Sequence, residues 1–451
     1  MDPLDTHSRQ PSPPLSLRLS PTRRHLVRED GSSFFYLGDT AWELFHRLNR
    51  EEAAHYLENR ASKGFTVIQA VALAELDGLH TPNAYGECPL VDDDPTRLNE
   101  AYFAHVDWIV EKAASLGLTM GMLPTWGDKW QRLGGVGPQI FDTANARAYG
   151  RILGERYRGQ PIIWILGGDR NPETDAEHAT LEAMALGLRE GDHGEHLITF
   201  HPRGPGRSSD AFHACEWLDF NMVQSSHAAH DFDNGVFAEH DRDLEPVKPT
   251  LDGEPRYETI PVGFYFRNNN RLDRFDAYDA RQAAYWSMLA GACGHTYGNN
   301  NIWQMWQPGR QPVIDACIPW VQALDHPGAF QMGLARRLFE SRPWQTLVPD
   351  QGMIVDGPSQ GGAKVRAARA DDGSFAFVYS PRGEAFTVRM DAIAARRVTQ
   401  TWYDPRYGAA YPIHTGGNAG VLTFSPPTSG RGNDWVLVLD DAEAGFSASG
   451  A

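Results

Sequence analysis

Short apolar runs alternate with amphipathic segments along the first two thirds of the chain. Runs such as 162–166 (IIWIL) show no polar alternation, which predicts strands buried on both faces, as in a parallel sheet covered by helices. The expected strands are 34–39, 66–71, 119–123, 162–166, 197–200, 220–224, 249–251 and 295–298. The segments between them carry helical spacing at 50–63, 102–115, 143–157, 175–189 and 276–289. This alternation predicts an α/β fold, a closed (β/α)8 TIM barrel.

A different pattern begins near residue 349, where short strand-like segments are separated by Gly, Pro and Asp turns. This is typical of a small antiparallel β-sandwich. The sandwich either packs on the barrel or binds a polymer. Aromatic residues such as Trp402 and Tyr403 more often fill a core, which favours packing. We divide the chain into a flexible tail (1–15), a barrel with short N-terminal strands (16–345), a β-sandwich (346–442) and a second tail (443–451).

Two of the expected strands end in a carboxylate. Asp169 follows the fourth strand in 162–170 (IIWILGGDR), and Glu254 follows the seventh in 249–255 (PTLDGEP). In TIM barrels the loops at these strand ends carry the chemistry, and two carboxylic acids there are the minimum for hydrolysing a glycosidic bond. Strands four and seven carry the acid/base and the nucleophile in the large clan of retaining barrel glycosidases. Strand-end acids also serve as helix caps, and Asp252 and Glu258 are rival carboxylates near Glu254.

The neighbours of the two acids fit a sugar-binding cleft. Gly167 and Gly168 stand before Asp169 where most of that clan has Asn-Glu. Aspartate is one methylene shorter than glutamate, so we expect the glycines to let substrate or backbone come closer. Arg170 and Asn171 are suited to binding hydroxyls. Aromatic residues crowd the same strand ends and could stack on sugar rings, although any one of them is more often core. They are Trp42, Trp126, Trp130, Tyr265, Tyr297, Trp303 and Trp306.

The histidines call for a comparison with metal sites. His227-x-x-His230 is a weak spacing signal without the carboxylate of an H-E-x-x-H motif, so no metal is expected. We expect His201 and His227 to bind substrate or a catalytic carboxylate instead. The glycine runs at 134–137 and 416–417 lack the strand-before, helix-after setting of a phosphate loop, and no cofactor is expected.

Composition limits the class of partner. A net charge of −17 opposes binding to nucleic acid or anionic membranes, and no stretch is long enough to span a bilayer. The four cysteines are scattered, so neither a disulfide framework nor a zinc knuckle is expected. Residues 1–30 lack the apolar core of a secretory signal, which predicts a cytoplasmic protein unless a leader has been removed. The expected partner is a carbohydrate, with no signal for an oligomeric state.

Four motifs resemble the apiosidase-like family, glycoside hydrolase family 140. They are 37–44 (LGDTAWEL), 64–69 (GFTVIQ), 165–169 (ILGGD) and 340–344 (ESRPW), and the resemblance extends over about residues 16–440. It implies a barrel followed by a small β-domain of the collagen-binding type. It also implies that Asp169 is the acid/base, that Glu254 is the nucleophile, and that Asp39, Trp42 and Gln69 line the sugar pocket.

The activity implied by this resemblance is exo-release of apiose, a branched furanose, from plant glycans or glycosides by a retaining mechanism. Other barrel glycosidases, such as an arabinofuranosidase or an endoglucanase-like β-glycanase, are alternatives. A carbohydrate-binding protein on a decayed barrel is a third hypothesis, although acids at both strand ends oppose it. An exo-enzyme requires a closed pocket and an endo-enzyme an open groove. The long loops at 74–99 and 126–140 favour a pocket.

Overall fold

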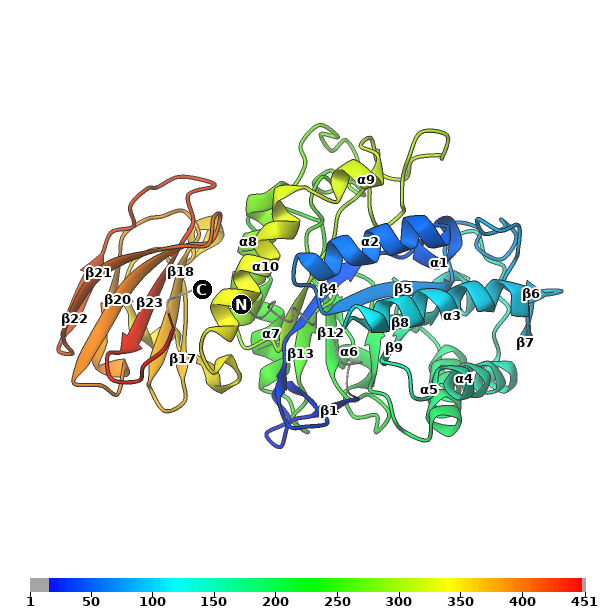
Figure 1. Ribbon diagram of the computed structural model, residues 1–451, viewed down its shortest axis with the longest axis horizontal. Helices are drawn as coiled ribbons and strands as arrows, with labels where there is room; N and C mark the ends of the chain where they lie inside the picture. Colours follow the sequence, from blue (N-terminus) through cyan, green and yellow to red (C-terminus); the bar gives the residue numbers. More distant parts are fainter. Residues whose placement is uncertain (1–15, 133, 448–451) are drawn as a thin grey trace, which may run out of the picture.

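The structure, a computed structural model, describes residues 16–132 and 134–447 (Figure 1). Its larger part is a ring of parallel strands surrounded by helices, which confirms the predicted TIM barrel. The ring strands are β4 (Tyr36–Thr40), β5 (Val67–Leu73), β8 (Thr119–Thr125), β9 (Ile162–Gly167), β10 (Ile198–His201), β12 (Asn221–Gln224), β13 (Thr250–Asp252) and β14 (Gly294–Tyr297). The tail predicted at 1–15 lies outside the described residues.

The ring is nearly closed. Its strands pair in parallel in the order β10-β9-β8-β5-β4-β14-β13-β12, and the short β11 (Gly206–Arg207) adds antiparallel to β12. Between β10 and β12 the Asp219 amide donates to the Ile198 carbonyl (2.9 Å). The Thr199 hydroxyl donates to the Phe220 carbonyl (2.7 Å). These bonds connect the two ends of the sheet, so all eight strand ends face one opening.

Burial on both faces explains the uninterrupted apolar runs. In β5, Val67 and Val71 belong to the cluster inside the barrel, whereas Ile68 and Ala70 belong to the cluster beneath the outer helices. Every residue of β5, β8 and β9 is buried. A strand covered by side chains inside and by helices outside has no solvent face on which polar residues would alternate.

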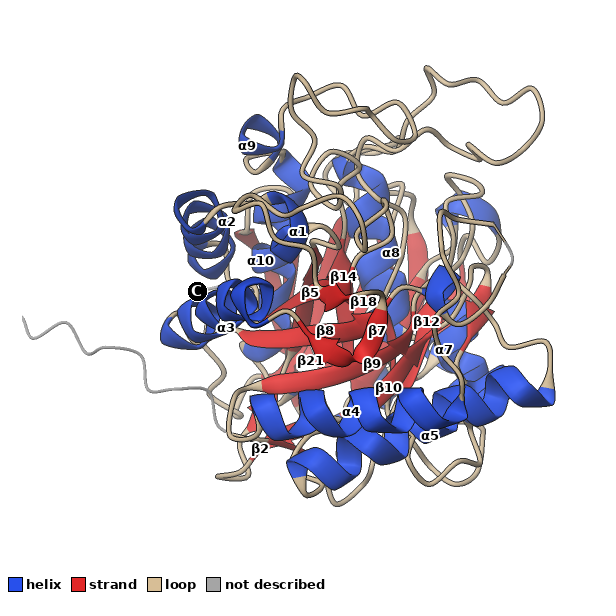
Figure 2. Ribbon diagram, turned by 90° about the vertical axis from the view of Figure 1, so that its right-hand side faces the viewer, coloured by secondary structure: helices blue, strands red, loops and turns tan. Residues whose placement is uncertain are grey.

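The outer helices begin at clear sequence signals. Capping boxes start α2, α4, α5 and α8, for example Thr174 with Glu177 at α5. Figure 2 shows α4 and α5 lying side by side below β9 and β10. None of the helices in the described residues has the length and apolar character that crossing a bilayer requires. The helices are α1 (Leu44–Arg47), α2 (Arg50–Ser62), α3 (Glu100–Ser115), α4 (Thr143–Tyr157), α5 (Asp175–Asp192), α6 (Ser209–Phe212), α7 (Gly235–Arg242), α8 (Ala277–Leu289), α9 (Trp320–Ala323) and α10 (Pro327–Glu340).

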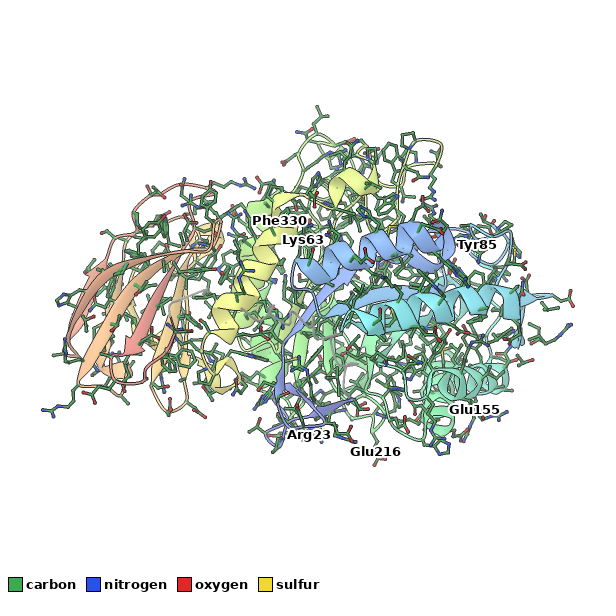
Figure 3. The ribbon with its side chains drawn as sticks, viewed as in Figure 1. Arg23, Lys63, Tyr85, Glu155, Glu216 and Phe330 are labelled. Atoms are coloured by element: carbon green, nitrogen blue, oxygen red, sulfur yellow. The ribbon has the colours of Figure 1, made fainter. Side chains whose placement is uncertain are left out.

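Helix α10 was not among the predicted helices. It begins with Pro327 and Gly328, two residues that usually break helices, but proline is well suited to the first turn because its missing N–H has no helical acceptor there. The helix contacts the C-terminal end of α2. The Lys63 ammonium lies over the Phe330 ring, 4.3 Å from its centroid, and both side chains are labelled in Figure 3.

The smaller part is an antiparallel β-sandwich, also as predicted. One sheet has the order β15-β17-β18-β23-β20-β21 and the other β16-β19-β22. Trp402 is buried between the sheets. The sandwich strands are β15 (Leu347–Pro349), β16 (Ile354–Asp356), β17 (Arg366–Ala370), β18 (Phe375–Ser380), β19 (Phe386–Arg389), β20 (Arg397–Asp404), β21 (Ala409–Gly417), β22 (Val421–Phe424) and β23 (Trp435–Asp441).

The larger sheet packs on the barrel through α8 and α10, visible at the left of Figure 1. Tyr285 of α8 stacks on Tyr379 of β18 with ring centroids 4.8 Å apart. A buried ion pair joins Arg281 to Asp434 at 2.6 Å. Past β23, Phe446 lies beside Phe375, so the described part of the predicted 443–451 tail rests on the sandwich. This sheet face is therefore occupied by packing on the barrel.

Shorter elements complete the chain. They are the antiparallel strands β1 (Leu17–Leu19), β2 (Leu26–Arg28) and β3 (Ser33–Phe34), the hairpin β6 (Leu90–Val91) and β7 (Asp94–Leu98), and the 3-10 turns η1 (Gly127–Lys129), η2 (Trp344–Thr346), η3 (Gln351–Met353), η4 (Gly361–Ala363) and η5 (Met390–Ala392).

Candidate active site

A pocket of about 560 Å³ opens at the carboxyl ends of the barrel strands. Its size is in the usual range for a small-molecule site. The segments that follow all eight ring strands contribute to its wall, so the pocket is a product of the whole ring. The lining residues are Trp42, Glu75, Trp126, Asp169, Arg203, Gly204, Gln224, Ser226, His227, Glu254, Tyr257, Ile260, Phe264, Tyr265, Phe266, Trp303, Val313 and Ile314.

Asp169 lies in this wall at the end of β9. Gly167 and Gly168 both have positive φ, at 99° and 93°. A Cβ on Gly167 would lie 2.3 Å from the His201 carbonyl oxygen, and one on Gly168 would lie 2.8 Å from the Gly127 nitrogen. The glycines therefore bring backbone close to backbone, which is one of the two possibilities expected from the sequence. The Asp169 side chain keeps 38% of its surface exposed.

The charge state of Asp169 is shifted toward the acid form. Burial raises its pKa to about 6, the negative charge of Glu254 acts in the same direction, and nearby His201 and Arg170 lower it. Asp169 is therefore half protonated in mildly acidic solution, where an ordinary aspartate is ionised.

Glu254 is held by two imidazoles from other strands. His227 Nε2 lies 3.0 Å from its Oε1, and His201 Nε2 lies 3.0 Å from its Oε2. The Asp169 amide donates to His201 Nδ1 and the Tyr257 amide donates to His227 Nδ1, both at 3.4 Å. Since each Nδ1 accepts a hydrogen bond, Nε2 is the ring nitrogen that presents a proton to Glu254 in both histidines. Each carboxylate oxygen thus faces one N–H donor.

These contacts stabilise the ionised form of Glu254. Burial alone would raise the pKa of Glu254, but its contacts with His201 and His227 outweigh burial and hold that pKa well below its usual range. The pocket therefore presents one carboxyl that readily carries a proton and one that stays ionised. Two carboxyls whose pKa values are pushed apart can divide the roles of proton donor and nucleophile.

The two rival acids face away from the pocket. The buried Asp252 side chain accepts a hydrogen bond from the Asn234 amide group (2.8 Å), and Glu258 accepts one from the Tyr297 hydroxyl (2.6 Å). Burial raises the pKa of Asp252 to about 6 and that of Glu258 to about 7. Neither residue is part of the pocket wall.

The predicted binding residues divide into two groups. Trp42, Trp126, Trp303 and His227 line the pocket. The other seven are not among the lining residues. Of these, His201 contacts Glu254. The ring centroids of His201 and Trp42 lie 5.3 Å apart in a T-shaped arrangement. The rings of Trp42 and Trp126 are tilted by 56° with centroids 5.4 Å apart, and they form an aromatic wall suited to the C–H faces of a sugar.

The remaining six predicted residues form the support beneath the wall. The buried Asp39 pairs with Arg60 at 2.7 Å, and Gln69 donates to the Gly253 carbonyl at 3.1 Å. Both side chains are therefore committed to the framework, which differs from the sugar contacts implied by the family resemblance. Similar framework bonds hold Trp130 Nε1 to the Gly167 carbonyl (2.9 Å), Arg170 to the Asp169 carbonyl (2.7 Å), Asn171 Oδ1 to the Arg203 amide (2.9 Å) and the Tyr297 hydroxyl to Glu258 (2.6 Å).

Several wall residues escaped the sequence reasoning. The clearest is Glu75, because β5 extends to Leu73 and places this acid at a strand end. An inspection of the acids at every strand end would have found it. Arg203, Gln224 and Tyr257 lie in segments whose spacing carries no distinctive signal, and only the ring brings them together.

The two histidines of His227-x-x-His230 contact different partners. His227 faces Glu254, whereas His230 lies 3.0 Å from Asp279 of α8. Within residues 16–132 and 134–447, no group of three or more His, Cys, Asp or Glu side chains could hold a metal ion.

Substitution of His227 by alanine is expected to lower kcat/KM at neutral pH by about 10- to 100-fold, the value of one hydrogen bond to a charged group. Loss of an N–H donor destabilises the ionised carboxylate, so the pKa of Glu254 rises and the acidic limb of the pH profile moves to higher pH. The measurement is kcat/KM against pH for His227→Ala, with His230→Gln as the matched control. An acidic limb equal to that of the wild type would contradict this role for His227.

Comparison with known proteins agrees with the geometry. Residues 20–346 match the family model described as "Apiosidase-like, catalytic domain", and residues 348–440 match "Putative collagen-binding domain of a collagenase". Comparison with curated proteins produced no match. One solved structure, described as a glycoside hydrolase, is 34% identical with a TM-score of 0.87, and the match covers 95% of this chain and 97% of that one.

A second solved structure is similar over the same extent. It is described as a glycoside hydrolase family 5 protein from Bacteroides vulgatus and is 32% identical, with a TM-score of 0.88 and coverage of 96% of this chain and 94% of that one. A family match across the barrel and two such relatives across both domains leave one assignment. The chain belongs to the apiosidase-like family and is a glycoside hydrolase.

Proposed function

We propose that this glycoside hydrolase is a retaining exo-enzyme that releases apiose from plant-derived glycans or glycosides. The observation that carries the mechanism is the divided pair of carboxyls in one pocket. Glu254 is kept ionised by two imidazole donors, and the pKa of Asp169 is raised to about 6 by burial and by the charge of Glu254. The sugar is proposed from the family match, and the pocket wall built by all eight strand ends supports attack on a terminal residue.

In the first step, Glu254 attacks the anomeric carbon and forms a glycosyl ester while the bond to the leaving oxygen breaks. Asp169 transfers its proton to that oxygen, so the leaving group departs as an alcohol and Asp169 becomes ionised. His201 and His227 hold the two oxygens of Glu254, which aims the carboxylate and keeps it unprotonated before attack.

In the second step, Asp169 removes a proton from water, the water oxygen attacks the anomeric carbon, and the ester bond to Glu254 breaks. Esterification removes the negative charge of Glu254, one of the causes of the raised pKa of Asp169. The pKa of Asp169 therefore falls in the intermediate, which suits its change from acid to base. Two displacements at one carbon return the original anomeric configuration.

The test is a panel of nitrophenyl furanosides and pyranosides that includes the β-apiofuranoside, with the anomer of the first product followed by NMR. We expect the apioside to be the best substrate and the first product to keep the substrate's configuration. Preference for an arabinofuranoside would contradict the assignment of apiose but would leave the retaining mechanism in place. An inverted first product would remove the nucleophile role from Glu254.

A further inference from the structure

The pocket wall contains a third carboxyl that the double displacement does not use. Glu75 follows β5 and lines the same pocket as Asp169 and Glu254. Within the described ranges 16–132 and 134–447, its carboxyl forms no hydrogen bond or ion pair with another residue. A partly buried acid without a protein partner is costly unless something else satisfies it.

The backbone beside Glu75 is firmly held. The fully buried Lys129 ammonium donates to the Ala74 carbonyl at 2.6 Å and to Asp128 at 2.7 Å. The Asp77 amide donates to the Glu75 carbonyl at 2.8 Å. These bonds anchor the chain on either side of the carboxyl, so the position of Glu75 in the wall does not depend on any contact of its own side chain.

The surroundings favour the neutral form of this acid. Burial raises the pKa of Glu75 well above its ordinary value, and the negative charges of Glu43, Asp169, Asp128 and Glu254 act in the same direction. A neutral carboxylic acid has both a donor and an acceptor, as a sugar hydroxyl pair does, whereas a carboxylate only accepts. It also adds no further negative charge to the pocket that contains Glu254.

We propose that Glu75 is a substrate-binding carboxyl that donates one hydrogen bond to, and accepts another from, hydroxyl groups of the sugar whose anomeric carbon Glu254 attacks. This inference rests on the proposed function and deepens it, because it selects a neutral sugar with free hydroxyls toward the β5 wall. A cationic amino sugar would instead pair with an ionised Glu75, and an acidic sugar would be repelled by Glu254.

The experiment compares Glu75→Ala and Glu75→Gln, using the nitrophenyl glycoside that the wild type hydrolyses fastest. Loss of two neutral hydrogen bonds is expected to lower kcat/KM of Glu75→Ala by about 10- to 100-fold. Glutamine also has a donor and an acceptor, so Glu75→Gln is expected to stay within about threefold of the wild type. Glu87→Gln is the matched control, since Glu87 lies on the same loop outside the pocket wall and is expected to keep wild-type activity.

A second measurement separates binding from a merely structural role. In the Asp169→Ala background a nitrophenyl leaving group needs no proton, so the alkaline limb of kcat/KM reports the ionisation of Glu75. We expect this limb to vanish in Asp169→Ala/Glu75→Gln. Glu75→Ala with wild-type kcat/KM, or a limb that persists in the double variant, would overturn the proposal.

The two proposals fail differently. A wild type that hydrolyses no glycoside of the panel, or full activity in Glu254→Ala, would remove the proposed function. Normal loss in Glu254→Ala together with wild-type behaviour of both Glu75 variants would remove only the role of Glu75. If Glu75→Ala does not fold, comparison of the pH profiles of Asp169→Ala and Asp169→Ala/Glu75→Gln still decides the question.

Discussion

Replacement of Glu254 by alanine is expected to lower kcat/KM by about 10⁴-fold or more for every substrate, because no covalent intermediate forms without the nucleophile. A good leaving group should not restore turnover, since the missing group attacks the carbon rather than protonating the oxygen. Azide fits the space left by the carboxylate and is expected to rescue activity by attacking directly. One displacement then produces a glycosyl azide of inverted configuration, measured by NMR.

The matched control is Glu216→Ala, which removes an exposed glutamate outside the pocket wall and is expected to keep wild-type kinetics. Correct folding of Glu254→Ala is checked by its circular dichroism. Substantial unaided turnover by a folded Glu254→Ala would contradict the assignment. A rescued azide product of retained configuration would contradict the single displacement.

Replacement of Asp169 by alanine is expected to produce a loss that depends on the leaving group. With an alkyl or sugar leaving group, which must be protonated, kcat/KM is expected to fall by about 10²- to 10⁴-fold. With a nitrophenyl group, kcat/KM is expected to fall by less than about tenfold. The measurement is a series of substrates ordered by leaving-group pKa, in which the variant has a much steeper dependence than the wild type.

The pH profile is an independent test of Asp169 as the proton donor. The pKa of Asp169 is raised to about 6, and its protonated form is the one that acts in the first step. Wild-type kcat/KM is therefore expected to fall as pH rises through about 6. This fall should disappear in Asp169→Ala with the nitrophenyl substrate, which leaves only the limb assigned to Glu75. Asp252→Asn is the control, because burial also raises the pKa of Asp252 to about 6 but its side chain lies outside the pocket wall. Loss of the limb in that control alone would transfer the role to Asp252.

Much of the fold can be predicted from local patterns in the sequence. The apolar run in β9 and the short one in β13 predict strands because both faces of each are covered, and counting such runs leads to the barrel. Helix α10 was missed because its first residues, Pro327 and Gly328, resemble a break when the supporting contact with Lys63 is not visible. Local sequence patterns therefore predict those helices and strands whose ends also carry a clear sequence signal.

The site was predicted less completely than the fold. Trp42 and Trp126 were expected at the pocket and line it, yet Trp130, from the same loop as Trp126, points its indole N–H at the Gly167 carbonyl beneath the wall. Glu75 was not singled out although it lines the pocket. Side chains a few residues apart at a loop point in different directions, and the sequence does not state which one faces the opening.

The sequence by itself determined that this chain forms a barrel and a sandwich and that acids follow the fourth and seventh strands, because these features depend on neighbours along the chain. Only the tertiary structure decided how those acids differ. His201, His227 and Glu254 come from β10 and the segments after β12 and β13, and their contacts at 3.0 Å exist only when the ring assembles. Protonation depends on burial and on charges across space, so it is a property of the assembled pocket.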